Sequence, residues 1–295
     1  ENIWQRFFIR ALVGDFPEAW QNYECRFDLQ SRTTPDHGFT QPRWLGESLP
    51  EKTILLHSEQ GFGDTIQMAR YAPQVAKQIG KVILWTPEPL AKLMKTVEGI
   101  DKVITQYSPA TQFDVHIPLM SLPGVFQDSL ESIPTSTPYL GPSSLCGKIH
   151  PIKKIGISWA GSGNQPLDRR SVPFEQFQPL IQDDSIQWHN LQYDTPTPSG
   201  LIDHGTEMTN FAATADVIDS LDLIITIDSA IAHLAGAMGK PVWIILNFAA
   251  DWRWGLDKDR TPWYPSARLF RQALEQPWSS VMAKIQTTLH AQKNG

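Results

Sequence analysis

The sequence is poor in cysteine, in positive charge and in long hydrophobic runs. Only Cys25 and Cys146 occur among 295 residues. Two cysteines do not build a disulfide scaffold, and we interpret them as free thiols of a reducing compartment. The net charge of -6 argues against a protein that mainly binds a nucleic-acid backbone. The longest apolar runs, such as residues 223–227, are far shorter than the roughly 20 residues of a membrane-spanning helix.

Motifs of several enzyme classes are also absent from the sequence. There is no HExxH, no paired CxxC and no P-loop lysine, so neither a dedicated metal site nor a P-loop phosphotransferase is expected. A GxSxG nucleophile turn is missing too. Since no cleavable signal segment opens the chain, we expect a cytoplasmic protein, with peripheral attachment at the inner membrane as an alternative.

Tryptophan and proline are abundant instead. The chain has 11 Trp and 23 Pro, and its hydrophobic content of 41% is enough for packed cores. Tryptophans near loops indicate a surface that stacks on a ligand.

The first thirty residues differ from the rest and predict a helical hairpin over 1–31. One helix covers 3–13, Gly14 to Pro17 interrupt it, and a second helix runs to about residue 29. The pattern Gly-Asp-Phe-x-x-Ala-x-x-x-Tyr resembles the corner of a tetratricopeptide repeat. One repeat cannot bury its own faces. Three interpretations stay open: further repeats precede it, the pair docks on the next domain, or it is an ordinary hairpin. The missing initial Met favours a truncated repeat array.

Two stretches of alternating strands and helices follow. The first stretch, 40–141, has strands expected at 53–57, 81–85, 102–106 and 114–117 and a helix at 64–79. The second, 152–275, has strands expected at 154–159, 186–191, 223–227 and 241–246 and a helix at 173–181. Alternation of this kind predicts an α/β protein with two Rossmann-like domains, each with a parallel sheet. Ligands of such sheets bind beyond the carboxyl ends of the strands.

A glycine-rich turn follows the first expected strand. Gly61 and Gly63 let the backbone approach a ligand, and the helix start behind them favours an anion. Asp64 opens the helix. It could act as a general base that deprotonates an acceptor hydroxyl, or simply cap the helix. A helix dipole lowers the basicity of such a carboxylate.

A second small-residue loop follows the strand at 154–159. Ser162 and Asn164 lie in it, and Arg169 and Arg170 follow within the same loop. Backbone N–H groups beside two guanidinium groups would suit a diphosphate. The alternative is a solvated surface loop.

The third and fourth constellations follow the two last expected strands. Asp228 ends one strand, and Ser229, Ala230 and His233 begin a helix of small residues that could bind a phosphate and a ribose. The alternatives are capping residues and a satisfied core histidine. In the loop after 241–246, Trp252 and Arg253 could hold a base or sugar. Trp254 and Trp263 could instead pin that loop structurally.

Together these motifs resemble tetratricopeptide-repeat proteins that carry a glycosyltransferase family 9 (heptosyltransferase-like) domain. The matching stretches are 59–71, 156–161, 168–173, 228–236, 251–254 and 263–271, in the order of the family. The resemblance implies the GT-B architecture, with two Rossmann-like domains facing a cleft and a last helix, 276–292, crossing back to the N-terminal domain. It also implies a metal-independent, inverting transfer without a cofactor.

The resemblance further implies the roles of individual residues. Asp64 matches the catalytic base, and Arg169 or Arg170 matches the basic residue at the leaving phosphate. The set expected to bind the nucleotide-diphosphate sugar is Gly61, Gly63, Ser162, Asn164, Gln192, Asp228, Ser229, Ala230, His233, Leu234, Trp252 and Arg253.

The acceptor and the reaction stay open at this point. The repeat-plus-GT-B arrangement also resembles the peptide O-linked N-acetylglucosamine transferases, so a protein acceptor competes with a glycan. The repeat segment could recruit a protein partner. A non-catalytic nucleotide-binding module and a nucleotide-sugar epimerase are the alternative functions.

Overall fold

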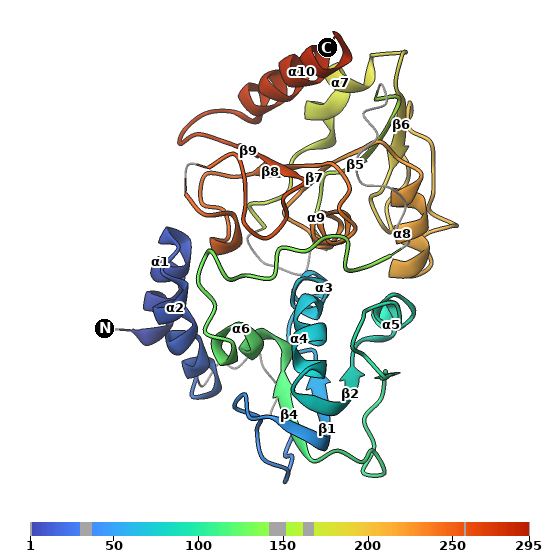
Figure 1. Ribbon diagram of the computed structural model, residues 1–295. Coiled ribbons are helices and arrows are strands. Elements are labelled where there is room, and N and C mark those ends of the chain that lie inside the picture. The colour runs from blue at the N-terminus through green and yellow to red at the C-terminus, as the bar shows by residue number, and fades with distance from the viewer. Residues whose placement is uncertain (1, 30–36, 142–151, 162–167, 257, 295) are drawn as a thin grey trace. The chain divides into compact units, whose positions relative to one another are not determined.

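The computed structural model describes residues 2–29, 37–141, 152–161, 168–256 and 258–294 (Figure 1). It divides into two compact units, Glu1–Leu140 and Gly141–Gly295. Each unit is built around one parallel β-sheet, as the alternation of strands and helices predicts. None of the described helices combines the length and the apolar character needed to cross a bilayer.

The first unit joins a helical hairpin to a four-stranded sheet of order β3-β2-β1-β4. All of its strand pairs are parallel. Its elements are α1 (Ile3–Val13), α2 (Phe16–Tyr23), η1 (Glu24–Phe27), β1 (Leu49–His57), α3 (Phe62–Met68), η2 (Ala69–Tyr71), α4 (Ala72–Ala76), β2 (Ile79–Trp85), α5 (Glu88–Met94), β3 (Lys102–Ile104), β4 (Val115–Pro118), η3 (Leu119–Ser121) and α6 (Leu122–Val125).

The second unit has a five-stranded parallel sheet of order β6-β5-β7-β8-β9. Its elements are β5 (Lys154–Ser158), η4 (Phe174–Phe177), α7 (Gln178–Ile181), β6 (Gln187–Asn190), α8 (Phe211–Asp219), β7 (Leu223–Ile227), α9 (Ala230–Ala237), β8 (Val242–Leu246), η5 (Trp252–Trp254), β9 (Ala267–Arg271) and α10 (Trp278–Asn294).

Two expected helices are shorter in the structure than the sequence predicts. The helix expected over 64–79 divides into α3, η2 and α4, and Ile79 already starts β2. Pro73 has no backbone N–H for the carbonyl of Ala69, so a continuous α-helix is interrupted there. Pro179 has the same effect on the helix expected over 173–181, which becomes η4 and α7.

The C-terminal helix α10 belongs to the second unit. Its side chains Val281, Met282, Ile285 and Leu289 are buried in the same core cluster as the strands β5 and β7. The apolar face of the helix is thus part of the core of its own unit. The expectation that residues 276–292 cross back to the N-terminal domain stays a prediction.

The helical hairpin packs inside the first unit. Gly14 ends α1 at φ 90°, and a side chain there would clash with Leu130. Phe7 and Tyr23 pack ring against ring with their centroids 4.6 Å apart. Of the three interpretations of this segment, docking on the neighbouring domain is the one that describes these contacts. No further repeat is found among the residues that the structure describes.

A buried ion pair fixes the hairpin to the sheet. The Arg26 guanidinium donates to both carboxylate oxygens of Glu59 at 3.0 and 2.9 Å, and to the Ser121 hydroxyl at 2.7 Å. Both charged side chains are almost inaccessible, at 2% and 0% exposure. The neighbouring Gln60 amide donates to the Tyr23 hydroxyl at 2.7 Å. The hairpin therefore holds the two residues that directly precede the glycine-rich turn at Gly61.

Replacement of Arg26 by Ala should lower the free energy of unfolding by about 3 kcal/mol, because it leaves the Glu59 carboxylate buried without its counter-ion. Urea unfolding followed by tryptophan fluorescence measures this change. Replacing both partners, as Arg26→Met with Glu59→Leu, should recover most of the loss. Arg10→Ala is the matched control, since its pair with Asp15 is more than one third exposed and should contribute less than about 1 kcal/mol. Equal losses in Arg26→Ala and Arg10→Ala would contradict this account.

Candidate functional site

A cavity of about 340 Å³ opens at the carboxyl edge of the second sheet. Ligands of parallel α/β sheets bind at this edge. Two arginines and three carboxylates contribute to its wall, and the residues after β8 complete it. The lining residues are Asp168, Arg169, Arg170, Asp228, Ile245, Leu246, Asn247, Ala249, Ala250 and Asp251.

Gln192 holds the backbone where β5 ends. Its side-chain oxygen accepts from the N–H groups of Trp159 and Ala160 at 3.1 and 2.9 Å, and its amide donates to the Ala160 carbonyl at 3.1 Å. We predicted a donor-binding role for Gln192. The structure shows a side chain that is buried and fully engaged with this backbone, which positions the loop after β5.

Asp168 organises the arginine loop. Its carboxylate accepts from the Arg170 backbone N–H and Nε at 3.0 and 3.1 Å, and from the Ser171 hydroxyl at 2.9 Å. Burial opposes ionisation of Asp168, but these hydrogen bonds and the Arg170 charge outweigh it and lower its pKa. Gly161 lies so close that a side chain there would meet the Asp168 carboxylate at 2.4 Å.

The two arginines differ in their partners. Arg170 is tied to Asp168 by an ion pair of 3.1 Å. Arg169 is exposed, and only its backbone carbonyl is engaged, by the Asn247 amide at 2.9 Å. In the part of the chain that the structure describes, the Arg169 guanidinium has no carboxylate partner, so its charge is available to a ligand in the cavity.

Asp228 follows β7 and has an unusual protonation behaviour. Burial, and after it the neighbouring Asp251, raise the pKa of Asp228 to about 6, although the Arg253 and Arg170 charges oppose the shift. Only 13% of this side chain is exposed, and the His233 Nε2 atom lies 4.0 Å from its carboxylate. The cavity thus contains a carboxyl group that changes charge near neutral pH.

The start of α9 lies directly behind Asp228. The Ser229 hydroxyl pairs with Thr226 at 3.2 Å and does not cap the helix, contrary to the capping alternative. Since a helix start has backbone N–H groups without intrahelical partners, this one can attract an anion. Ala230 begins the helix, and Leu234 is completely buried within it.

His233 is a core histidine. It is 5% exposed, its Nδ1 atom pairs with the Tyr264 hydroxyl at 2.8 Å, and its ring lies 5.4 Å from the ring of Trp254. These contacts agree with the interpretation of His233 as a satisfied core histidine. Its Nε2 atom lies beside the Asp228 carboxylate, at 4.0 Å.

The tryptophans after β8 form a buried layer. Trp252, Trp254 and Trp263 are 4%, 1% and 0% exposed, and Trp252 packs edge-on against Trp263 at 5.8 Å. Arg253 lies over the Trp252 ring and donates to Asp251 at 2.8 Å. Their burial fits the interpretation that Trp254 and Trp263 pin this loop, and Asp251 is the residue of the loop that lines the cavity. The role of Trp252 in holding a base or sugar stays a prediction.

The predicted catalytic base Asp64 and the predicted donor-binding residues Gly61 and Gly63 lie in the first unit. The Gly61 N–H donates to the Asp64 carboxylate at 2.9 Å. Asp64 is the third residue of α3, which begins at Phe62, and it is partly exposed. Asp64 thus caps the helix, because its carboxylate accepts from the backbone N–H of Gly61, the residue before the helix. Gly61 and Gly63 belong to the turn that leads into α3.

The structure brings together Arg169, Arg170 and Asp228 and places Ser229 and Ala230 directly behind them. Ser162 and Asn164 lie outside the described residues. The prediction missed Asp168, Asn247 and Asp251 as cavity residues. Their positions just after β8 or inside the arginine loop were the available signal. Across the described ranges, no group of three His, Cys, Asp or Glu side chains is arranged to hold a metal ion.

Comparison with known proteins links this site to one enzyme family. Residues 207–290 match the model of glycosyltransferase family 9 (heptosyltransferase). The chain is 24% identical to protein FlbA of Caulobacter vibrioides, across 98% of this chain and 55% of FlbA. It therefore spans about half the length of this relative. The glycosyltransferase family 9 part of the predicted resemblance is thus matched over residues 207–290, and glycosyltransferase is the enzyme class of that family.

Solved structures confirm the predicted fold class. The chain resembles E. coli heptosyltransferase WaaC with ADP, with a TM-score of 0.53 and 11% identity over 81% of this chain and 99% of that one. It also resembles the iron-containing dodecameric glycosyltransferase TibC from enterotoxigenic E. coli H10407, with a TM-score of 0.55 and 10% identity over 83% of this chain and 80% of TibC. The two parallel sheets are those of the GT-B fold.

Replacement of Asp228 by Asn should stabilise the protein only at higher pH. The carboxyl group ionises near its ordinary pKa of 3.8 in the unfolded chain, whereas in the folded protein it ionises near 6. Ionisation therefore costs the wild type stability between these values, and the full cost remains above pH 6. The variant should gain on the order of 2 kcal/mol at pH 8, and this gain should vanish near pH 4. Urea unfolding at both pH values measures it. Asp216→Asn, on the exposed face of α8, should show no such pH dependence; the same profile in both variants would refute a special role for Asp228.

Proposed function

We propose that the chain is a glycosyltransferase that moves a sugar from a nucleotide-diphosphate sugar to a hydroxyl group of a glycan or a protein. One observation carries this proposal. The segment that matches family 9, residues 207–290, contains Asp228 and Asp251, which line the cavity together with Arg169 and Arg170. The same segment contains the start of α9, which follows Asp228 in the chain. An arginine-lined cavity beside a helix start is suited to a diphosphate.

The donor we propose is an adenosine-diphosphate sugar, with a heptose as the sugar. The similarity to WaaC, whose structure contains ADP, supports this choice. The Arg169 guanidinium would contact the diphosphate directly. Arg170, held by Asp168, would add positive potential from a fixed position. This difference between the arginines follows from their partners and favours Arg169 as the one that is free to move onto a ligand.

Charge neutralisation by these groups makes a metal unnecessary in the proposed mechanism. When the bond between the sugar and the diphosphate breaks, negative charge grows on the leaving phosphate. A guanidinium and the open N–H groups of α9 stabilise such charge where it develops. Inversion at the anomeric carbon is part of the proposal, as the family resemblance implies, and so is the absence of a cofactor.

Asp228 would couple donor binding to protonation. A diphosphate brought close to this carboxyl adds like charge and would raise its pKa further above 6. In its protonated form, Asp228 can donate a hydrogen bond to the donor, for example to a ribose hydroxyl. An ionised Asp228 would instead add to the repulsion that the carboxylates of Asp168 and Asp251 exert on the ligand.

Asp64 is the proposed general base that deprotonates the acceptor. Its bond from the Gly61 N–H orients the carboxylate, which would take the proton of the acceptor hydroxyl. Since Glu59 and Gln60 are held by Arg26 and Tyr23, the hairpin stabilises the turn that carries this base.

A protein partner at the hairpin also belongs to the proposal. The outer face of α1 exposes Ile9 and Val13 at 64% and 62%, an unusual exposure for aliphatic side chains. Such a face is suited to stacking with another helical pair, as in repeat arrays. A cytoplasmic location also belongs to the proposal, with attachment at the inner membrane as its alternative.

Calorimetry with ADP-, GDP- and UDP-sugars should show binding of the adenine nucleotide. Ala230→Glu adds negative charge at the start of α9, which the helix tolerates but a diphosphate does not, so affinity should fall about tenfold or more. Arg169→Gln should lower affinity by a similar factor. Ala212→Glu, at the start of α8, is the matched control and should bind like the wild type. If no nucleotide sugar binds, the proposed function is wrong.

Asp64→Asn should reduce turnover about 10²-fold or more and leave donor affinity unchanged. Asparagine keeps an oxygen that accepts the Gly61 N–H, so the turn survives while the base is lost. Turnover is measured as nucleoside-diphosphate release in the presence of cell-extract acceptors, and treatment with a chelator should not alter it. Unchanged turnover in the variant would leave Asp64 as a helix cap. Nucleotide binding without any transfer by the wild type would favour the non-catalytic module, and sugar isomerisation without acceptor would favour an epimerase.

A further inference from the structure

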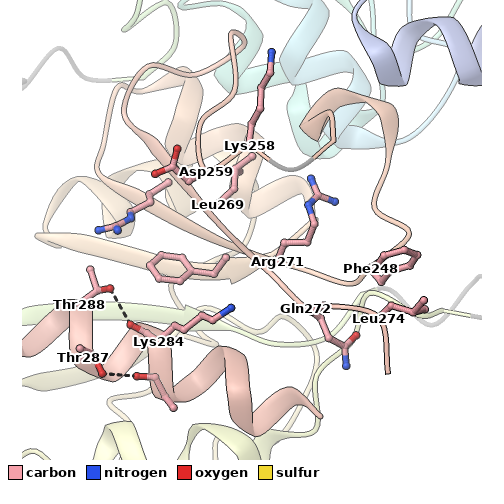
Figure 2. Close-up of a pocket in the computed structure, with 14 residues that line it drawn as sticks. Phe248, Lys258, Asp259, Leu269, Arg271, Gln272, Leu274, Lys284, Thr287 and Thr288 are labelled. Carbon is pink, nitrogen blue, oxygen red and sulfur yellow. Dashed lines mark hydrogen bonds between the residues drawn. The ribbon is translucent and has the colours of Figure 1, made fainter. Parts of the chain in front are cut away.

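A second and larger hollow lies beyond β9, the last strand of the second sheet. It has a volume of about 750 Å³ and shares no lining residue with the cavity at Asp228. Figure 2 shows that β9 and α10 border it, with the loop of Lys258 and Asp259 on one side and Phe248 on the other. The proposed transfer reaction makes no use of it.

Positive charge dominates the lining of this hollow. Lys258, Arg268 and Lys284 line it together with Arg271, and among the described residues Asp259 is the single acidic one in the lining. Within the described part of the chain, no carboxylate lies within ion-pair distance of Lys258, Arg268 or Lys284. This concentration of cations is unusual in a protein whose net charge is -6.

Apolar side chains lie between these charges. Phe248 and Leu274 are 53% and 61% exposed at one end of the hollow. Phe270 forms part of the floor, is 6% exposed, and has the Arg268 guanidinium 5.3 Å from its ring centre. Exposed aromatic and aliphatic groups next to cations are a frequent composition of protein-binding surfaces.

The frame of the hollow is held by backbone hydrogen bonds. The Leu269 N–H donates to the Asp259 carbonyl at 2.8 Å, which fixes the flanking loop to the outer edge of β9. Arg271 donates to the carbonyls of Trp254 and Gly255 at 3.2 and 2.8 Å. The opposite wall, α10, is anchored by its buried face in the core. A partner would therefore meet a preformed surface, which reduces the entropy cost of binding.

We propose that this hollow binds an acidic peptide segment that also carries apolar side chains, as part of a protein partner. Figure 2 shows that the charged ends of Lys258, Arg271 and Lys284 point in different directions and do not converge on one point. A single phosphate needs convergent donors, whereas an extended chain with several carboxylates meets separated cations. Its apolar side chains would cover Phe248 and Leu274. The volume lies in the range of pockets that enclose side chains or small ligands.

Fluorescence polarisation with the full chain tests this site. The probe is a labelled short peptide in which Glu alternates with Leu and Phe. Charge reversal in the double variant Arg268→Glu, Lys284→Glu should weaken its binding about tenfold or more, because two attractive contacts become repulsive. Phe248→Ser should weaken it several-fold through the lost apolar contact. Lys92→Glu, an exposed charge reversal on α5, is the matched control and should leave binding unchanged.

Three comparisons separate this proposal from other anions. A peptide with Gln in place of Glu, and one with Ser in place of Leu and Phe, should both bind more weakly than the probe. Equal binding of the probe by wild type and by the Arg268, Lys284 double variant would overturn the proposal. The proposal would also be overturned if inorganic phosphate, a sulfated oligosaccharide or anionic lipid vesicles bound more strongly than the probe and the double variant abolished that binding. Thermal melting confirms that each variant is folded, and nucleotide-sugar affinity, measured in parallel, reports on the donor site separately.

Discussion

The ion pair between Arg26 and Glu59 is the constraint on which the first unit depends. Two charges removed from water are tolerated only when nearly every donor and acceptor is satisfied. That condition is met here, since Ser121, Glu24 and the Tyr23 carbonyl complete the guanidinium shell and the Tyr23 and Phe27 rings cover it. The pair binds the hairpin to the sheet and fixes the backbone that leads into the turn of Gly61 and Asp64. An element that resembles a repeat thus supports the loop proposed for catalysis.

The second unit solves a different electrostatic problem. Its cavity holds Asp168, Asp228 and Asp251 beside two arginines, so positive and negative groups nearly balance. Asp168 and Asp251 are each bonded to an arginine, Arg170 and Arg253, whereas Asp228 is left with a raised pKa. Under the proposed function, affinity for a diphosphate would depend on Arg169, on the start of α9 and on the proton of Asp228. The ion pairs Asp168–Arg170 and Asp251–Arg253, rather than an excess of positive charge, therefore determine the electrostatics of the site.

The sequence predicts most of the sheets and less of what covers them. The buried run Leu223–Ile227 is apolar except for Thr226, which is typical of a strand covered on both faces, and the sequence predicts this strand at its observed bounds. Strand β9 was missed because two arginines flank its apolar residues, as the edge of a sheet permits. The prolines that divide two expected helices were readable in principle, and their effect was underestimated. The sequence leaves open whether Trp252, Trp254 and Trp263 face a ligand or pin their loop. In the structure all three side chains are buried.

By itself, the sequence determined the two α/β halves, the strand ends that carry polar residues and the family resemblance, because apolar period and motif order are local properties. Only the tertiary structure decided the partners of each charged group. Arg169 and Arg170 are adjacent and chemically identical, yet among the described residues only Arg170 has a carboxylate partner. Arg26 and Glu59 are 33 positions apart and meet in a core. Desolvation and ion pairing act through space, so the protonation of Asp228 and the basic hollow beside β9 emerge only when distant segments are packed together.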